Sequence, residues 1–336
     1  MMMQALRLTE WGKEPELVRV PVPEPGPGEL LLLVEAAGLC HSDLHVMDSA
    51  GTLPYDLPFT LGHEVAGTVV AIGTGVPRDW LDQPVAVHGV WSCGECRRCR
   101  EGRENYCLRL TGPIGAGLGY DGGLAEFILV PSERFLVKAG GVKQEQLAPL
   151  TDAGLTAFHA VHENLDAIAG GGTALVVGIG GLGHLAVQVL RALSSAEVIA
   201  VDPRESAQAV AREHGADLVL SGLELLDDRV DLALDFVGSD TTLCQAAQLL
   251  APGGRLVVVG SAGGSLAASK RGALPRGWQL SAPFWGARSD LEAVVELAAE
   301  GALVAETETG SLAEAPELYR RLRGGEVRGR AVVVPH

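Results

Sequence analysis

A glycine-rich loop between an apolar strand and a helix constrains the fold of this chain more than any other feature. Residues 178–183 have the spacing G-x-G-x-x-G and directly follow the apolar run Thr173–Val177. The first glycine permits a tight turn, the second lets a pyrophosphate approach the backbone, and the third allows close helix–strand packing. The loop therefore predicts a dinucleotide-binding strand–turn–helix unit. We expect its cofactor contacts to come from Gly178, Gly180, Gly181, Leu182 and Gly183.

Strands and helices alternate around this loop. Predicted strands are Thr173–Val177, Glu197–Val201, Val230–Phe236 and Arg255–Val259, and predicted helices are Leu182–Leu193 and Thr241–Leu250. Such alternation is typical of a doubly wound parallel sheet. We therefore expect an α/β protein with a Rossmann domain over residues 153–286.

The end of the second predicted strand indicates which dinucleotide binds. Asp202 lies there, nineteen residues after Gly183. A carboxylate at this place accepts hydrogen bonds from the ribose 2′-hydroxyl and repels a 2′-phosphate, which favours NAD over NADP. Arg204, two residues on, leaves NADP open. The alternative for the whole segment is an ordinary strand–helix turn in which Asp202 is only a cap.

Sequence outside this region predicts a second, mostly-β domain. At 336 residues, two domains are expected. Leu30–Val34 and Val65–Ile72 read as strands, whereas residues 88–123 are loop-like, and a loop that long needs a metal or a comparable anchor. The C-terminal part contains predicted helices and a strand-like end, namely Asp290–Glu300, Ala313–Arg323 and Arg330–Val334. We expect residues 287–336 to return to a first domain that spans residues 1–152.

Four cysteines in the loop-like region predict a structural metal site. Cys93, Cys96, Cys99 and Cys107 have the spacing C-x2-C-x2-C-x7-C, which can close one tetrahedral, all-thiolate zinc site. The alternatives are four unrelated thiols or a zinc ribbon that binds nucleic acid. Nearby arginines favour the ribbon, but neighbouring glutamates offset them, and the net charge of −16 argues against nucleic acid or an anionic membrane as partner. Cys244 lies in an Ala/Leu-rich segment, and we expect it to be buried.

A second set of metal-ligand residues lies outside this cluster. Cys40, His63 and Asp152 would leave the fourth position of a zinc ion open, and an open position is where zinc does chemistry. Taken singly, Cys40 is equally consistent with a core cysteine and His63 with a buried histidine. Together, one closed and one open zinc site before a dinucleotide loop predict a zinc-dependent dehydrogenase. Its expected cofactors are NAD and two zinc ions per chain.

The segments around these residues resemble the signature of zinc-containing alcohol dehydrogenases of the medium-chain superfamily. The similarity lies in Gly62–Val76 and Cys40–His45, and with the cysteine cluster and the glycine loop it spans essentially the whole chain. The resemblance implies a GroES-like catalytic domain that carries both zinc sites. It implies that Cys40 and His63 bind the catalytic zinc. Asp152 stands where the best-known members carry cysteine, and some bacterial relatives are similar in carrying Asp.

The resemblance also implies roles for other residues. Asp43 orients His63, Glu64 lies behind the zinc, Ser42 is the hydroxyl beside the substrate alcohol, and His45 ends a proton relay at the surface. The residues implied at the cofactor are His41 and Arg330 near the pyrophosphate and Thr156 beside the nicotinamide. Phe284 and Trp285 are candidates for an apolar substrate pocket, and their alternative is core packing.

The predicted function is reversible hydride transfer between a primary or secondary alcohol and NAD, giving an aldehyde or ketone. A polyol, sugar or threonine-type dehydrogenase on the same scaffold is an alternative. A non-catalytic NAD-binding zinc protein is another, but it would not need Ser42 and His45. A zinc-free quinone reductase would not need either metal set.

We expect a small-molecule substrate and no nucleic-acid or membrane partner. No run of about 18 apolar residues suggests a membrane span. Met1–Trp11 shows no secretory pattern, so six cysteines indicate a reducing, cytoplasmic compartment. By resemblance, we expect a homo-oligomer, either a dimer or a tetramer.

Overall fold

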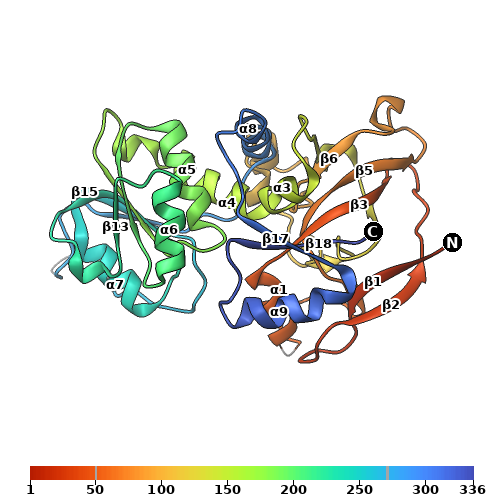
Figure 1. Cartoon of the computed structure of the whole chain (residues 1–336). Coiled ribbons are helices and arrows are strands. Elements are labelled where there is room, and N and C mark those ends of the chain that lie inside the picture. The colour runs from red at the N-terminus through yellow and green to blue at the C-terminus, as the bar shows by residue number, and fades with distance from the viewer. Residues whose placement is uncertain (50, 270–271) are drawn as a thin grey trace. The chain divides into compact units, whose positions relative to one another are not determined.

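The computed structural model of the chain describes residues 1–49, 51–269 and 272–336, which form two compact units (Figure 1). Unit 1 contains Met1–Asp152, Ala287–Glu300 and Ala305–His336, and unit 2 contains Ala153–Gly286 and Gly301–Val304. The main crossings of the chain between the two units therefore lie at residues 152/153 and 286/287. None of the described helices is long and apolar enough to cross a membrane.

Unit 2 is built on a sheet of six parallel strands. The strands are β11 (Thr173–Val177), β12 (Glu197–Val201), β13 (Leu218–Leu220), β14 (Val230–Asp235), β15 (Leu250–Val258) and β16 (Gln279–Ser281). Their order in the sheet is β13-β12-β11-β14-β15-β16. Counted along the chain this is 3-2-1-4-5-6, the order of dinucleotide-binding sheets. Such sheets bind ligands where the strand order reverses, which here is between the carboxyl ends of β11 and β14.

Three helices follow strands of this sheet in the chain, namely α5 (Gly183–Leu193), α6 (Glu205–Glu213) and α7 (Asp240–Leu249), and a fourth, α4 (Leu155–His162), precedes β11 and contacts α5. Because such crossovers are right-handed, α5 and α6 lie on one face and α7 on the other. Strands buried on both faces are apolar at successive positions, as in Ala174–Val177 of β11, where every residue is buried. The doubly wound sheet predicted from the alternation is confirmed.

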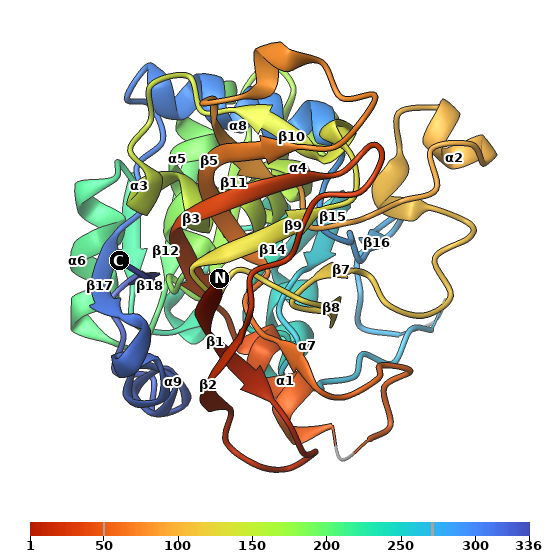
Figure 2. The same cartoon turned by 90° about the vertical axis from the view of Figure 1, so that its right-hand side faces the viewer.

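Unit 1 is mostly β, and Figure 2 shows its strands β5, β3 and β9 side by side. A seven-stranded sheet has the order β10-β6-β5-β3-β18-β17 with β9 also on β3, beside a three-stranded sheet β2-β1-β4 and the short pair β7-β8. The strands are β1 (Met2–Leu8), β2 (Glu16–Pro21), β3 (Leu30–Leu39), β4 (Phe59–Thr60), β5 (Glu64–Ile72), β6 (Pro84–Val87), β7 (Gly115–Ala116), β8 (Gly119–Tyr120), β9 (Phe127–Val130), β10 (Leu136–Lys138), β17 (Thr307–Ser311) and β18 (Arg330–Val334). The α-helices are α1 (His41–Asp48), α2 (Arg97–Arg100), α3 (Gln144–Pro149), α8 (Arg288–Ala299) and α9 (Ala315–Arg323).

The C-terminal segment is part of the unit 1 sheet. Strand β18 pairs antiparallel with β3, with Ala331 opposite Leu39, and parallel with β17. Strand β18 has the predicted bounds, but β17 was not predicted. Its sequence, Thr-Glu-Thr-Gly-Ser, lacks the apolar alternation that identifies a strand, and it forms because β18 supplies a partner.

Two other local features differ from expectation. Strand β15 begins at Leu250, before the predicted start at Arg255, because an irregular register with β14 accommodates Gly253 at φ +83°. Cys244 is exposed, not buried. On α7 the buried residues are Leu243, Ala246 and Ala247, so Cys244 lies on the outward face of the helix.

Candidate active site

The four cysteines of the loop-like region converge in unit 1. The Sγ atom of Cys96 lies 3.4 Å from that of Cys99 and 4.0 Å from that of Cys107, and Cys93 Sγ lies 3.9 Å from Cys99 Sγ. Four sulfur ligands around a zinc ion stand about 3.8 Å apart. Backbone N–H groups, including that of Leu108, donate to the sulfur of Cys96 and lower the pKa of its thiol to about 6. The cluster therefore fits a closed, four-thiolate structural zinc site.

A second group of ligand atoms comes from three separate elements of unit 1. Cys40 follows β3 and caps the N-terminus of α1, and His63 immediately precedes β5. Asp152 lies on a π-helical turn, Leu150–Gly154, that follows α3. π-Helical turns are rare and often mark functional sites. All three side chains are buried.

The distances in this group match the requirements of zinc. Asp152 Oδ2 lies 3.6 Å from Cys40 Sγ and 3.3 Å from His63 Nε2. Tetrahedral coordination separates a sulfur and an oxygen ligand by about 3.6 Å, and a nitrogen and an oxygen ligand by about 3.4 Å. With Glu64 included, the ligand atoms all lie within 4.8 Å of one another. The donor set of thiolate, imidazole and carboxylate thus fits a single zinc ion.

Hydrogen bonding and charge at His63 also favour a cation. Its Nδ1 lies 2.9 Å from Asp43 Oδ1, so its Nε2 is the nitrogen directed towards Asp152. The contact predicted between Asp43 and His63 is present. Burial lowers the pKa of His63, but the Asp43 and Asp152 carboxylates raise it by more, well above its usual value. Carboxylates that favour a proton on this ring favour a metal cation for the same reason.

Glu64 lies beside the cluster and is held by an arginine. Its Oε1 accepts a hydrogen bond from Arg330 Nη2, and both side chains are buried. Burial raises the pKa of Glu64 to about 7, although the positive charge of Arg330 acts in the opposite direction. Gly38 lies opposite Glu64 in the sheet, and a Cβ atom there would stand 1.8 Å from Glu64 Oε2. Sequence reasoning missed this ion pair, and the predicted contact of Arg330 with pyrophosphate stays a prediction.

Helix α1 carries the other residues predicted around this cluster. Ser42 Oγ lies 3.7 Å from Cys40 Sγ and is half-buried. His41 and His45 are exposed. Ser42 and His45 are three residues apart on the helix, so their side chains share one face.

In unit 2, the glycine loop has the geometry that its sequence predicts. Gly178 directly follows β11 at φ +86°, and a Cβ atom there would lie 2.6 Å from the Val237 side chain. At Gly183, the first residue of α5, a Cβ atom would lie 1.9 Å from the carbonyl oxygen of Gly178. At Gly180 the nearest atom, on Arg204, would be 3.9 Å away. The backbone at the second glycine is therefore open to a ligand, as pyrophosphate binding requires.

Asp202 ties this loop to the end of β12. Its Oδ2 accepts the Ile179 N–H at 2.8 Å, and Arg204 forms a bidentate pair with the carboxylate at 3.0 and 2.9 Å. Burial raises the pKa of Asp202, but these hydrogen bonds lower it by more, so the group is a carboxylate. The side chain of Arg204 remains about half exposed, whereas Asp202 is buried. The sequence placed both residues at the cofactor but did not predict their pairing.

Comparison with known proteins identifies the family. Residues 26–141 match the Alcohol dehydrogenase GroES-like domain, and residues 181–300 match the Zinc-binding dehydrogenase domain. The chain is 34% identical to the NAD-dependent alcohol dehydrogenase of Sulfurisphaera tokodaii, over 99% of this chain and all of that protein. The chain belongs to the zinc-containing alcohol dehydrogenase family. The resemblance predicted from the motifs is confirmed, together with the GroES-like and Rossmann fold.

Solved structures agree with this assignment of the dehydrogenase. The alcohol dehydrogenase of Aeropyrum pernix is 33% identical, covers 99% of this chain and all of its own, and superposes with a TM-score of 0.91. The acetophenone reductase of Geotrichum candidum, solved with NAD, is 35% identical over 99% of this chain and 97% of its own, with a TM-score of 0.89. Both similarities extend over the glycine loop and both metal clusters.

Three further residues predicted for the dehydrogenase lie in unit 2. Thr156 is buried on α4. Phe284 is 38% exposed and Trp285 is buried, with their ring centroids 6.0 Å apart in an edge-on arrangement. Trp285 has φ +53°, a backbone conformation that bulky residues rarely adopt. Their predicted contacts with nicotinamide and substrate stay predictions.

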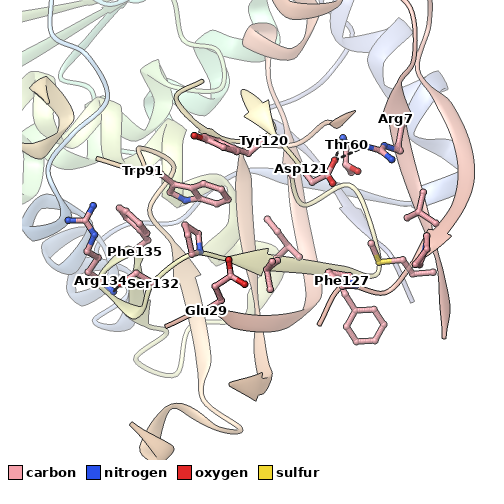
Figure 3. Close-up of a pocket in the computed structure, with 18 of the residues that line it drawn as sticks. Arg7, Glu29, Thr60, Trp91, Tyr120, Asp121, Phe127, Ser132, Arg134 and Phe135 are labelled. Atoms are coloured by element: carbon pink, nitrogen blue, oxygen red, sulfur yellow. Dashed lines mark hydrogen bonds and ion pairs between the residues drawn. The ribbon is translucent and has the colours of Figure 1, made fainter. Parts of the chain in front are cut away.

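The dehydrogenase also has a cavity of about 850 Å³ in unit 1 (Figure 3). Trp91 and Tyr120, with ring centroids 5.2 Å apart, contribute to its wall, and Arg7 pairs with Asp121 at 3.1 Å. The described residues that line this cavity include Cys93 but not Cys40, His63 or Asp152. The cavity is therefore distinct from the predicted catalytic zinc site.

Proposed function

We propose that this dehydrogenase catalyses reversible hydride transfer between an alcohol and NAD, giving an aldehyde or a ketone. The observation that carries the proposal is the convergence of Cys40, His63 and Asp152 at distances that fit one tetrahedral zinc ion. The glycine loop of unit 2, with its open backbone at Gly180, supports NAD as the hydride acceptor. The NAD-dependent relatives support the same reaction.

We propose that Cys40, His63 and Asp152 are the zinc ligands and that Glu64 stays outside the resting coordination sphere. Arg330 supports this assignment because it engages one oxygen of Glu64 and so competes with a metal for that carboxylate. Cys40, His63 and Asp152 would hold the zinc ion, which would supply a Lewis acid for the substrate oxygen. Thiolate and carboxylate each carry one negative charge, so the zinc complex is formally neutral.

We assign the proton path to helix α1. Ser42 lies beside Cys40 and is half-buried, so its hydroxyl is suited to accept the proton of a bound alcohol. His45 lies one helical turn further along the same face and is exposed, so it can exchange a proton with water. His41, also exposed and on the same helix, we place near the cofactor.

Replacing Ser42 by Ala tests this path. We expect kcat for alcohol oxidation to fall by about 10²-fold or more, since a positioned proton-transfer group contributes roughly that much. The zinc content should stay at two ions per chain. Ser49→Ala, at the end of the same helix, is the matched control and should leave kcat unchanged. Equal turnover in Ser42→Ala and the native enzyme would remove Ser42 from the mechanism.

Asp202 provides a test of cofactor choice. In Asp202→Ala we expect the preference for NAD over NADP, measured as a ratio of kcat/KM values, to fall by at least about 10-fold. The variant lacks the carboxylate that would accept hydrogen bonds from the ribose diol and repel a 2′-phosphate. Arg204 also loses its ion-pair partner and becomes available to bind that phosphate. An exposed ion pair in the same unit, Arg191–Asp217, offers a control in Asp217→Ala. An unchanged ratio in Asp202→Ala would contradict the ribose role.

Metal analysis combined with an NADH absorbance assay over a panel of alcohols and ketones tests the function as a whole. We expect two zinc ions per chain and turnover of medium-chain or aryl secondary alcohols, because Phe284 and Trp285 favour an apolar pocket. Polyols, sugars and threonine belong in the panel, and a preference for one of these would replace the proposed substrate class. Absence of any NAD-linked turnover in the zinc-loaded protein would contradict the proposal.

We further propose that residues 1–152 with 287–336 form the catalytic domain and that residues 153–286 bind NAD. All six cysteines are free thiols, which supports a cytoplasmic, reducing environment.

We also propose a homo-oligomer. Strand β16 lies at the edge of its sheet and exposes Leu280 by 52%, and an exposed edge strand can pair with the same strand of another copy. Sedimentation as a single species of 35.0 kDa would contradict the oligomer.

A further inference from the structure

The C-terminal helix of unit 1 contacts the helix that carries the proposed catalytic residues. Figure 1 shows α9 beside α1, although the two helices are more than 260 residues apart in the chain. Two polar contacts join them. Tyr319 donates its hydroxyl to Asp43 Oδ2 at 3.0 Å, and Arg323 pairs with Asp48 at 2.6 and 3.1 Å. The first contact is buried, with Tyr319 only 1% exposed, and the second is at the surface.

The buried contact completes the hydrogen bonding of Asp43. This carboxylate is fully buried, and three groups among the described residues form hydrogen bonds with it. Its Oδ1 faces His63 Nδ1 at 2.9 Å, and its Oδ2 accepts from the Cys40 N–H at 3.0 Å and from the Tyr319 hydroxyl. Two donors on one oxygen fix the plane of the carboxylate, and that plane aims the other oxygen at the imidazole.

We propose that Tyr319 is a positioning residue for the catalytic metal site: its hydroxyl fixes Asp43, and through Asp43 the ring of His63. The inference rests on the proposed function only in taking His63 as a zinc ligand. Partners that orient a ligating histidine commonly change metal affinity by about 10–100-fold when they are removed. Tyr319 is one hydrogen bond further from the metal than Asp43, so we expect a smaller change in metal affinity, of about 3–10-fold.

The chemistry of the phenol suits this role. Burial, and then the nearby Asp43 charge, raise the pKa of Tyr319 well above its usual value, so the hydroxyl keeps its proton and remains a donor. A phenylalanine at this place would preserve the ring and its packing but leave Oδ2 of Asp43 with the Cys40 N–H alone. A buried carboxylate that loses a donor relaxes towards another partner, and the orientation of His63 relaxes with it.

The test is the rate at which the zinc-loaded enzyme releases its more labile zinc to excess chelator. In Tyr319→Phe we expect this release to be about 3–10-fold faster than in the native enzyme. Release of the second zinc, from the four-cysteine site, should be unchanged and serves as an internal control. Arg323→Gln is the matched variant, because it removes the surface contact between α1 and α9 but leaves the hydroxyl bond in place. It should release zinc at the native rate.

A second readout separates geometry from packing. With cobalt in place of the labile zinc, the visible absorption bands of the metal should shift in Tyr319→Phe and stay unchanged in Arg323→Gln. Unchanged release and unchanged bands in Tyr319→Phe would overturn the inference, as would equal effects of the two variants. A native enzyme that binds only one zinc would instead contradict the proposed function, so the two failures are distinguishable.

Discussion

Asp152→Ala is expected to lose the labile zinc and nearly all alcohol oxidation while keeping the zinc of the four-cysteine site. Asp152 Oδ2 contacts both other ligand atoms, at 3.6 Å from Cys40 Sγ and 3.3 Å from His63 Nε2. Its removal leaves Cys40 and His63 as ligands. Glu64 is nearby, but one of its oxygens already accepts a hydrogen bond from Arg330. We expect kcat/KM to fall by more than about 100-fold, the upper range for loss of an outer partner of a metal ligand. Metal content and NADH formation measure both effects.

Asp152→Cys is the matched control for this prediction. Thiolate restores the charge and supplies the ligand type that zinc accepts at about 2.3 Å, so the variant should bind two zinc ions and recover much of the activity. Asp152→Asn, which has nearly the same shape without the charge, should behave like the Ala variant. An Ala variant that retains both zinc ions and native turnover would show that Asp152 is not a ligand.

The largest expected loss of stability comes from breaking the buried ion pair between Glu64 and Arg330. In Arg330→Met the free energy of unfolding should fall by about 3–5 kcal/mol, since removing one partner leaves the other group buried without its counter-charge. Both side chains are buried, so water cannot take the place of the guanidinium. Denaturant unfolding of the protein without its labile zinc, which could otherwise take the place of the guanidinium at Glu64, measures the loss.

A surface pair provides the comparison. Arg323 and Asp48 are 45% and 55% exposed, and Arg323→Met should cost no more than about 1 kcal/mol. The double variant Glu64→Gln, Arg330→Met should recover part of the loss, because no charge then remains buried at this place. Equal stabilities of Arg330→Met and Arg323→Met would contradict the account of the buried pair.

Features that depend on contiguous residues were predictable from the sequence. Gly178 is required by its own φ of +86°, and Gly183 by its contact with the Gly178 carbonyl, both within one strand–turn–helix unit. The spacing of the four cysteines determines how they close around a metal. Strands β11, β12 and β18 have the predicted bounds, because an apolar run between turn residues identifies a buried strand without knowledge of its neighbours.

Features that depend on distant residues were not predictable from spacing. Glu64 and Arg330 are 266 positions apart, and Asp43 and Tyr319 are 276 apart. The pairing of β5 and of β18 with β3 brings the first pair together, and the packing of α9 on α1 brings the second pair together. Asp152 was located through family resemblance and not through its spacing from Cys40, 112 positions away. Strand β17 is polar, so its partner and not its own sequence explains it.

Anomalous diffraction at the zinc absorption edge, from crystals of the zinc-loaded enzyme, tests the central claim most directly. The account predicts two peaks per chain. One should lie among the four cysteines, and the other should be coordinated by Cys40 Sγ, His63 Nε2 and an oxygen of Asp152. A single peak at the four cysteines, or a second peak that Asp152 does not contact, would contradict it.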